Sequence, residues 1–211
     1  LVSNVILQPE VAVPTVEFCG REWTAVNADV SVDGFGNTIP LAGSPQEWND
    51  FCGQSLPCRA YKNFDISNQD LGALYNVFAR DAVAVPNDGG NIWRIPNFDD
   101  FKQLTFVKKD EADCDAQWQQ NSTAAKPGKW NPQPSNTAYW GETGLDIQGY
   151  GIFTGASGGS FNLEGQVEYI WRQNGRNIGV FALYNNNVLV YSGLAGNNDK
   201  SGCFIRFVRD L

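Results

Sequence analysis

The side chains best suited to covalent chemistry are the five cysteines, Cys19, Cys52, Cys58, Cys114 and Cys203. None of them is spaced as Cys-x-x-Cys, which argues against a metal cluster and against a thioredoxin-like redox site. Disulfide formation is therefore the chemistry that we expect. Cys52 and Cys58 are close enough in the chain to close a small loop, although the spacing leaves several pairings open.

Acid–base catalysis has little support in the composition, because the chain contains no histidine. This removes the commonest general base, the Ser-His-Asp arrangement and the usual zinc ligand sets. We therefore expect a protein that is not an enzyme and that has neither a cofactor nor a metal ion.

The segment 169–191 contains residue types that are common in ligand-binding sites. Trp171 and Tyr191 offer flat aromatic faces, and Arg172 and the Asn185–Asn187 turn offer hydrogen-bond donors of the kind that sugar and protein sites use. We predict that Trp171, Arg172, Asn185, Asn186, Asn187 and Tyr191 form a ligand-binding face. The alternative for the aromatic residues, including Tyr169, is packing within a sheet.

The net charge of the chain disfavours two classes of binding partner. With 23 acidic and 15 basic residues the net charge is −8, which disfavours nucleic-acid phosphates and anionic membrane surfaces. No apolar stretch is long enough to cross a bilayer, so we expect no membrane insertion.

The elements that must position these residues begin with the last ten positions. The run from Gly202 to Asp210 is apolar on both faces of a strand, which predicts a strand inside a sheet. Arg206 lies in its middle, and we expect this guanidinium to be buried in a structural role, paired with a carboxylate or with several backbone carbonyls.

The rest of the chain alternates short elements with long polar loops. Residues 1–15 contain prolines that exclude a helix, and they form an arm or linker that is also a candidate contact for homo-oligomers. A strand is predicted over 16–26, capped helices from Ser44 and from Asn97, a polar loop over 107–144, and an antiparallel sheet of short strands after Leu145.

Five stretches of the chain, taken in order, resemble the Fibrobacter succinogenes major paralogous domain (FISUMP) family. Phe18–Asn27 resembles its "IGGQxWMAENL", and Leu71–Ala79 its "YGxLYNWYA". Trp93–Phe101 is similar to "WHLPTxxEW", and Gly151–Trp171 to "GGxxxxxGSF…yWSS". Gly202–Asp210 resembles "GFSVRCVRD".

The resemblance implies an α+β, C-type-lectin-like domain over residues 16–211. Such a domain has small antiparallel sheets, two flanking helices, long loops, and paired N- and C-terminal strands. It would place Leu71–Ala79 on a strand. Since the first and last strands should then be neighbours, we predict a Cys19–Cys203 disulfide, with Cys52–Cys58 as a second bridge.

The resemblance also implies a place outside the cell, as a secreted, cell-surface or virion protein. We expect an adhesion-type recognition module whose receptor is a carbohydrate or a surface protein. The alternative is a structural decoration or appendage subunit that binds a virion or surface scaffold. An enzyme like the formylglycine-generating oxidases, which share the lectin-like fold, would need a reactive thiol pair in a motif that the chain lacks.

Overall fold

The structure is a computed structural model of the 211-residue chain. It describes residues 13–18, 20–86, 92–97, 99–100, 145, 147, 151–154, 160–162, 167–173, 178–183, 189–192 and 199–211. Of 18, 162, 167, 178–183 and 189–192 only the backbone is described. These residues form an α+β fold of short helices and largely antiparallel sheets.

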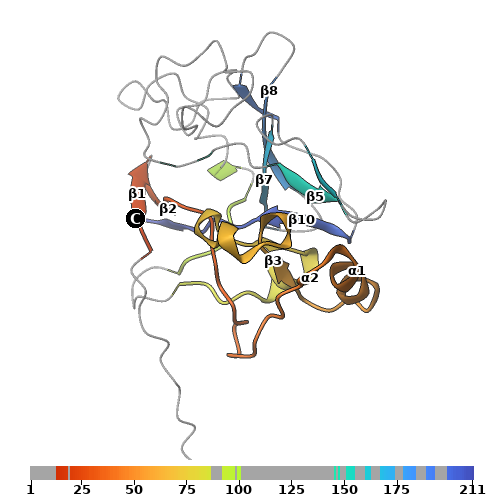
Figure 1. The fold of residues 1–211 in the computed structure, drawn as a ribbon. Helices are drawn as coiled ribbons and strands as arrows, with labels where there is room; N and C mark the ends of the chain where they lie inside the picture. Colours follow the sequence, from red (N-terminus) through yellow and green to blue (C-terminus); the bar gives the residue numbers. More distant parts are fainter. Residues whose placement is uncertain are drawn as a thin grey trace, which may run out of the picture.

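A three-stranded sheet joins the two ends of the described chain. Its order is β1 (Thr15–Phe18), β2 (Arg21–Thr24) and β11 (Val208–Asp210), all antiparallel. Figure 1 shows β1 and β2 beside the C-terminus. The predicted pairing of the terminal strands is thus confirmed. The single strand predicted over 16–26 is instead a hairpin, because Gly20, at a φ of 69°, lets the chain reverse.

The second sheet has the order β3-β4-β10-β7-β8-β9, and β5, which pairs with β6, joins it at β10. Its strands are β3 (Arg59–Ala60), β4 (Leu74–Tyr75), β5 (Ile152–Thr154), β6 (Ser160–Asn162), β7 (Val167–Trp171), β8 (Ile178–Leu183), β9 (Leu189–Ser192) and β10 (Ser201–Phe204). The prediction of an antiparallel sheet needs one correction, since β10 runs parallel to β7.

The C-terminal run, predicted as one strand, divides between the two sheets. Its first part is β10 and its last part is β11, and Ile205–Phe207 crosses from one sheet to the other. Backbone carbonyls of this crossing accept hydrogen bonds from Ala28 N at 2.8 Å and Thr24 N at 3.0 Å. Every residue from 201 to 208 is buried, so this run is the centre of the core.

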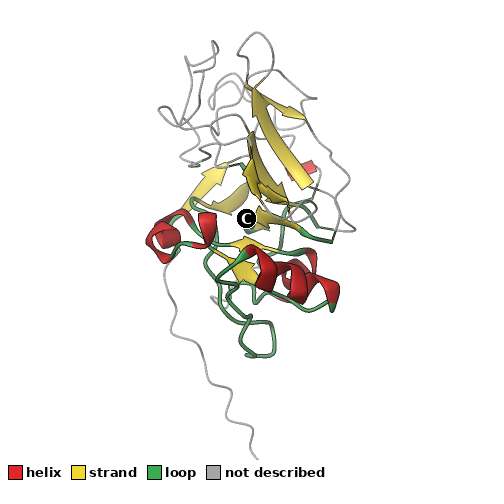
Figure 2. Cartoon of the chain, turned by 45° about the vertical axis from the view of Figure 1, so that its right-hand side comes forward, coloured by secondary structure: helices red, strands yellow, loops and turns green. Residues whose placement is uncertain are grey.

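Two α-helices lie near β3, at the end of the fold opposite to β8 (Figure 1; Figure 2). In α1 (Pro45–Gly53), Ser44 Oγ accepts a hydrogen bond from Glu47 N at 3.2 Å, as the capping pattern predicts. The second helix, α2 (Val77–Ala82), begins after Asn76, whose Oδ1 accepts from Ala79 N at 2.8 Å. The segment 71–79 is therefore only briefly a strand before it becomes helical.

The helix predicted from Asn97 is described only at its start. Asn97 Oδ1 accepts hydrogen bonds from the backbone N–H groups of Asp99 and Asp100, which confirms the predicted N-cap. Two 3₁₀-helices, η1 (Lys62–Phe64) and η2 (Ile66–Leu71), lead into β4. No helix among the described residues is long and apolar enough to span a membrane.

Candidate functional site

Trp171, the first residue of the predicted ligand-binding face, lies in the core and not at the surface. Trp171 is completely buried in β7, between β10 and β8, and its Nε1 donates a 2.7 Å hydrogen bond to Tyr75 O. The guanidinium of Arg80 lies 5.1 Å from the centroid of the indole ring. Trp171 is therefore a core residue, and the prediction that it presents a face to a ligand is wrong.

Of the remaining residues of that predicted face, Arg172 is the one whose side chain the structure describes. Arg172 is buried, and its backbone oxygen accepts a hydrogen bond from Arg80 Nη1 at 3.2 Å. The turn Asn185–Asn187 and the side chain of Tyr191 lie outside the described residues. Because Trp171 is completely buried within the sheet, the alternative of sheet packing holds for it.

The predicted disulfides are not present among the cysteines that the structure describes, where Cys52, Cys58 and Cys203 are all free thiols. The first and last strands are neighbours, as predicted, but Cys203 does not lie in the last strand; it lies in β10, which pairs with β4, β5 and β7 in the second sheet. Cys19 and Cys114 lie outside the described residues. Burial raises the pKa of the Cys203 thiol well above its usual value.

Cys52 and Cys58 are neighbours in space as well as in sequence, but as a hydrogen-bonded thiol pair. The hydrogen bond from the Cys58 thiol lowers the pKa of Cys52, and Asn76 Nδ2 lies 3.5 Å from Cys52 Sγ. The same hydrogen bond raises the pKa of Cys58. Both residues are buried.

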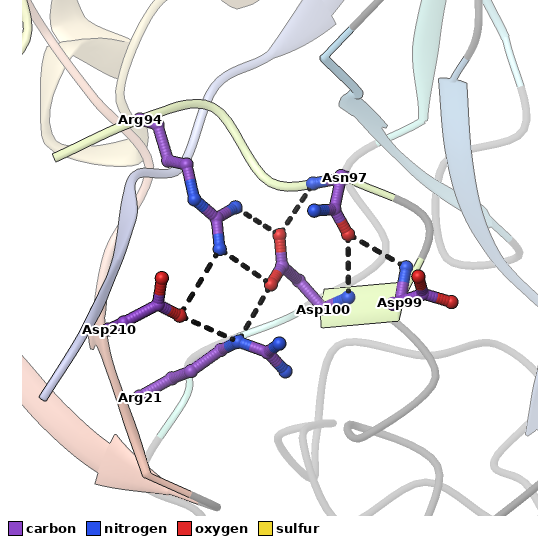
Figure 3. Close-up of polar contacts among 6 residues, drawn as sticks. All are labelled: Arg21, Arg94, Asn97, Asp99, Asp100 and Asp210. Carbon is purple, nitrogen blue, oxygen red and sulfur yellow. Dashed lines mark hydrogen bonds and ion pairs between the residues drawn. The ribbon is translucent and has the colours of Figure 1, made fainter. Parts of the chain in front are cut away.

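A charged network joins segments that are far apart in the sequence (Figure 3). The fully buried carboxylate of Asp100 accepts two hydrogen bonds from Arg94, one of them Nη2 to Oδ1 at 3.0 Å. Arg21 Nε lies 2.8 Å from the same carboxylate, and Asn97 N donates to it at 2.6 Å. The carboxylate of Asp210 lies 3.3 Å from Arg21 and 3.5 Å from Arg94.

This network has two positive and two negative charges, which compensate one another. The hydrogen bond to Asp100 is the main cause that raises the pKa of Arg94, so this arginine stays charged. The network connects β2, β11, the segment 92–97 and the helix start at 99. These ion pairs and hydrogen bonds hold the four segments together, which is a structural role.

Arg206 occupies the predicted structural position. It is buried, and its Nε donates to Asn27 Oδ1 at 3.0 Å. Its Nη1 donates to the backbone oxygens of Thr24 at 3.3 Å and Ala25 at 2.7 Å, which confirms the expected pairing with carbonyls. Asn27 in turn donates from Nδ2 to the buried carboxylate of Glu168 at 3.3 Å.

An aromatic cluster that the sequence analysis did not identify reaches the surface near η1 and β6. Phe153 is buried, and its ring centroid lies 5.1 Å from those of both Phe64 and Phe161. The two outer rings are 5.7 Å apart at an interplanar angle of 73°, and both are partly exposed. We call Phe64 and Phe161 the aromatic platform.

The platform could not be found from sequence patterns, because it depends on an unusual backbone. Asn63 and Phe64 both have a φ of 57°, in the left-handed region. Asparagine tolerates this conformation, whereas a phenylalanine there is an outlier. In the sequence, Phe161 belongs to a family-like motif, but no pattern indicates that Phe64 lies next to it.

The structure offers no candidate metal centre in the part of the chain that it describes, where no group of three or more Cys, Asp or Glu residues is arranged to hold an ion. No family model, curated protein or solved structure matches the chain.

Proposed function

We propose that the chain is a non-catalytic recognition module of the C-type-lectin-like, FISUMP type, acting outside the cell on a glycan or a surface protein. The observation that carries this proposal is the convergence of the five family-like stretches. They are scattered between residues 18 and 210, and the contacts below join each of them to the C-terminal stretch.

The contacts between the stretches are strand pairings and buried hydrogen bonds. Trp23 pairs with Val208 in the first sheet, and Tyr75 pairs with Cys203 in the second. Phe204 pairs with Ile170. A sequence whose family-like motifs meet in one core is what membership of such a family predicts.

The third stretch meets the fifth through backbone and side chains. Arg94 and Val208 exchange two backbone hydrogen bonds of 2.9 and 2.8 Å. Arg209 places its guanidinium 4.6 Å from the ring centroid of Trp93, while its Nε donates to Glu22 at 2.6 Å.

The same contacts explain why we propose recognition and not catalysis. The charged side chains of the motifs, Arg94, Asp100, Arg206 and Arg209, are engaged within the fold by ion pairs and hydrogen bonds. A general acid or base must instead be free to exchange a proton with a substrate. The motif residues thus build a scaffold, and function belongs to surfaces mounted on it.

Binding of the fluorescently labelled chain to intact candidate host cells tests the proposal. We expect saturable binding that excess unlabelled chain displaces. Periodate treatment of the cells would abolish binding to a glycan, and protease treatment would abolish binding to a surface protein.

A folded chain that binds no cells and assembles with a scaffold protein at fixed stoichiometry would contradict this proposal. That result would assign the chain to the alternative class of structural decoration or appendage subunits. Cells coated with an unrelated acidic protein of similar size are the control for nonspecific adhesion.

A further inference from the structure

The hydrogen-bonded thiol pair of Cys52 and Cys58 lies where a helix end meets the start of a strand. Cys52 belongs to the last turn of α1, and Cys58 directly precedes β3. The two cysteines are 5% and 0% exposed, whereas residues 53–56 between them are exposed. A bond between the two sulfur atoms would therefore tie α1 to β3 beneath an exposed turn.

The turn between the two cysteines is held by backbone hydrogen bonds. Ser55 has a φ of 57°, in the left-handed region, and its N donates to Cys52 O at 3.1 Å. Leu56 N donates to Phe51 O at 2.9 Å. These hydrogen bonds fix the chain reversal that brings Cys58 back to the helix end.

One buried residue, Asn76, contacts both members of the pair. Its Nδ2 lies 3.5 Å from Cys52 Sγ and donates to Leu56 O at 2.8 Å. Its Oδ1 accepts from Cys58 N at 3.1 Å, and its backbone N donates to Cys58 O at 3.1 Å. Because Asn76 is fully buried as the N-cap of α2, the helix that it begins fixes the position of both cysteines.

The two thiols differ in their readiness to react. The Cys58 thiol donates to the sulfur of Cys52, and this hydrogen bond is the main cause that lowers the pKa of Cys52 and raises the pKa of Cys58. The thiolate is the attacking species in thiol–disulfide exchange. Cys52, which is also the less buried of the two, is therefore the better nucleophile, with Cys58 already in contact with it.

We propose that Cys52 and Cys58 form a reversible disulfide that links the end of α1 to the start of β3 in an oxidising environment. Packing as small apolar side chains accounts for the burial of each cysteine, and the contact between their sulfur atoms is the additional feature. Thiols in contact need only approach to a bond length of about 2.05 Å. The bridge does not depend on the proposed recognition function, although a location outside the cell would favour it.

The oxidant is a small-molecule disulfide such as oxidised glutathione, which local opening of the 53–56 turn admits. The Cys52 thiolate attacks one sulfur of this molecule, forms a mixed disulfide and releases one glutathione thiolate. Cys58 then loses its proton and attacks Cys52 Sγ, which releases the second glutathione. Two protein thiols are thus oxidised, one disulfide is reduced to two glutathione molecules, and these take up the two cysteine protons.

The test equilibrates the full chain in glutathione buffers of increasing oxidised fraction. Thiols that remain free are alkylated after acid quenching and denaturation, and peptide mass spectrometry then maps each cysteine. We expect Cys52 and Cys58 to lose alkylation together and to regain it after treatment with dithiothreitol. The oxidised chain should melt about 5 °C higher than the reduced chain, because the bridge constrains the unfolded state.

Cys203 is the internal control in the same samples. Its thiol is completely buried and its pKa is raised, so we expect it to stay free.

Two variants identify the attacking thiol. In Cys58→Ala the mixed disulfide cannot be resolved, so we expect one glutathione to remain on Cys52. In Cys52→Ala we expect Cys58 to stay unmodified. Neither variant should melt higher after oxidation. If an alanine variant does not fold, the cysteine map of the unsubstituted chain still decides whether the bridge forms.

Three results would contradict the proposal. Cys52 and Cys58 that both stay free in the most oxidising buffer, in a folded chain, would overturn the bridge. A bridge from either of them to Cys19 or Cys114 would overturn the pairing. Glutathione retained on Cys58 in Cys52→Ala as readily as on Cys52 in Cys58→Ala would overturn the order of attack. None of these results bears on cell binding, so the recognition function is tested separately.

Discussion

The Nε atom of Arg21 lies 2.8 Å from the carboxylate of Asp100, and this ion pair fastens the N-terminal hairpin to a helix start 79 positions further along the chain. Arg94 binds the same carboxylate, so Asp100 compensates two guanidinium groups at once. The carboxylate has no exposed surface, while Arg21 and Arg94 are 19% and 23% exposed. The first prediction concerns this pair.

Asp100→Asn should destabilise the fold by about 3–5 kcal/mol, because it leaves two partly buried arginines without their buried counter-ion. Urea unfolding measured by circular dichroism gives the change in the free energy of unfolding. The matched control is Asp210→Asn in the same network, which should cost about 1 kcal/mol or less because Asp210 is 71% exposed. Equal costs for the two variants would show that the network is not organised around Asp100.

Gly202→Ala should destabilise the core by about 1–3 kcal/mol, because an added Cβ would lie 2.9 Å from the indole ring of Trp48. Thermal unfolding followed by tryptophan fluorescence reports on the same contact. Gly53→Ala is the control, since a Cβ there meets nothing within 4 Å. If both substitutions were neutral, the packing of β10 against α1 would be looser than the structure shows.

Trp171→Phe should lower stability while leaving receptor binding unchanged. The substitution removes the hydrogen bond to Tyr75 O, and the unsatisfied carbonyl costs about 1–3 kcal/mol. Chemical denaturation and the cell-binding assay, run on the same preparation, separate the two effects. A folded variant with reduced binding would return Trp171 to the ligand site.

Stability should fall as the pH rises above about 8.5, the ordinary pKa of a thiol, because of Cys203. Burial raises the pKa of this thiol in the folded protein, so above that pH the unfolded chain loses the proton while the folded chain keeps it. The stabilising contribution of the neutral thiol is complete below pH 8.5 and declines above it. The free energy of unfolding, measured between pH 7 and 10 in reducing buffer, should decline less steeply in Cys203→Ala.

Several local elements could be predicted from sequence because their causes are local. The helix start at Ser44 and the N-cap at Asn97 depend on side chains that satisfy backbone groups two or three residues away. The burial of Arg206 followed from an apolar run on both sides of it, since a charge in such a run must find partners. Pairing of the terminal strands came from the family resemblance.

The incorrect predictions concern contacts that form only when the chain folds. Aromatic side chains such as that of Trp171 are common in ligand-binding sites. Only the position of Trp171 in the strand between β10 and β8 makes it a core residue. The predicted Cys19–Cys203 bridge requires the whole C-terminal run to be one strand beside the first strand. That run in fact divides at Ile205–Phe207 and leaves Cys203 in the second sheet.

The sequence by itself determined the helix caps, the buried arginine and the net negative charge, because capping, apolar patterning and composition do not depend on distant contacts, whereas the α+β class was expected from the family resemblance. Only the tertiary structure decided which side chains are exposed, which thiols are neighbours, and that Phe64 meets Phe161. Phe64 and Phe161 are about a hundred positions apart in the chain. These contacts depend on strand order and on a left-handed backbone at Phe64, which no local pattern encodes.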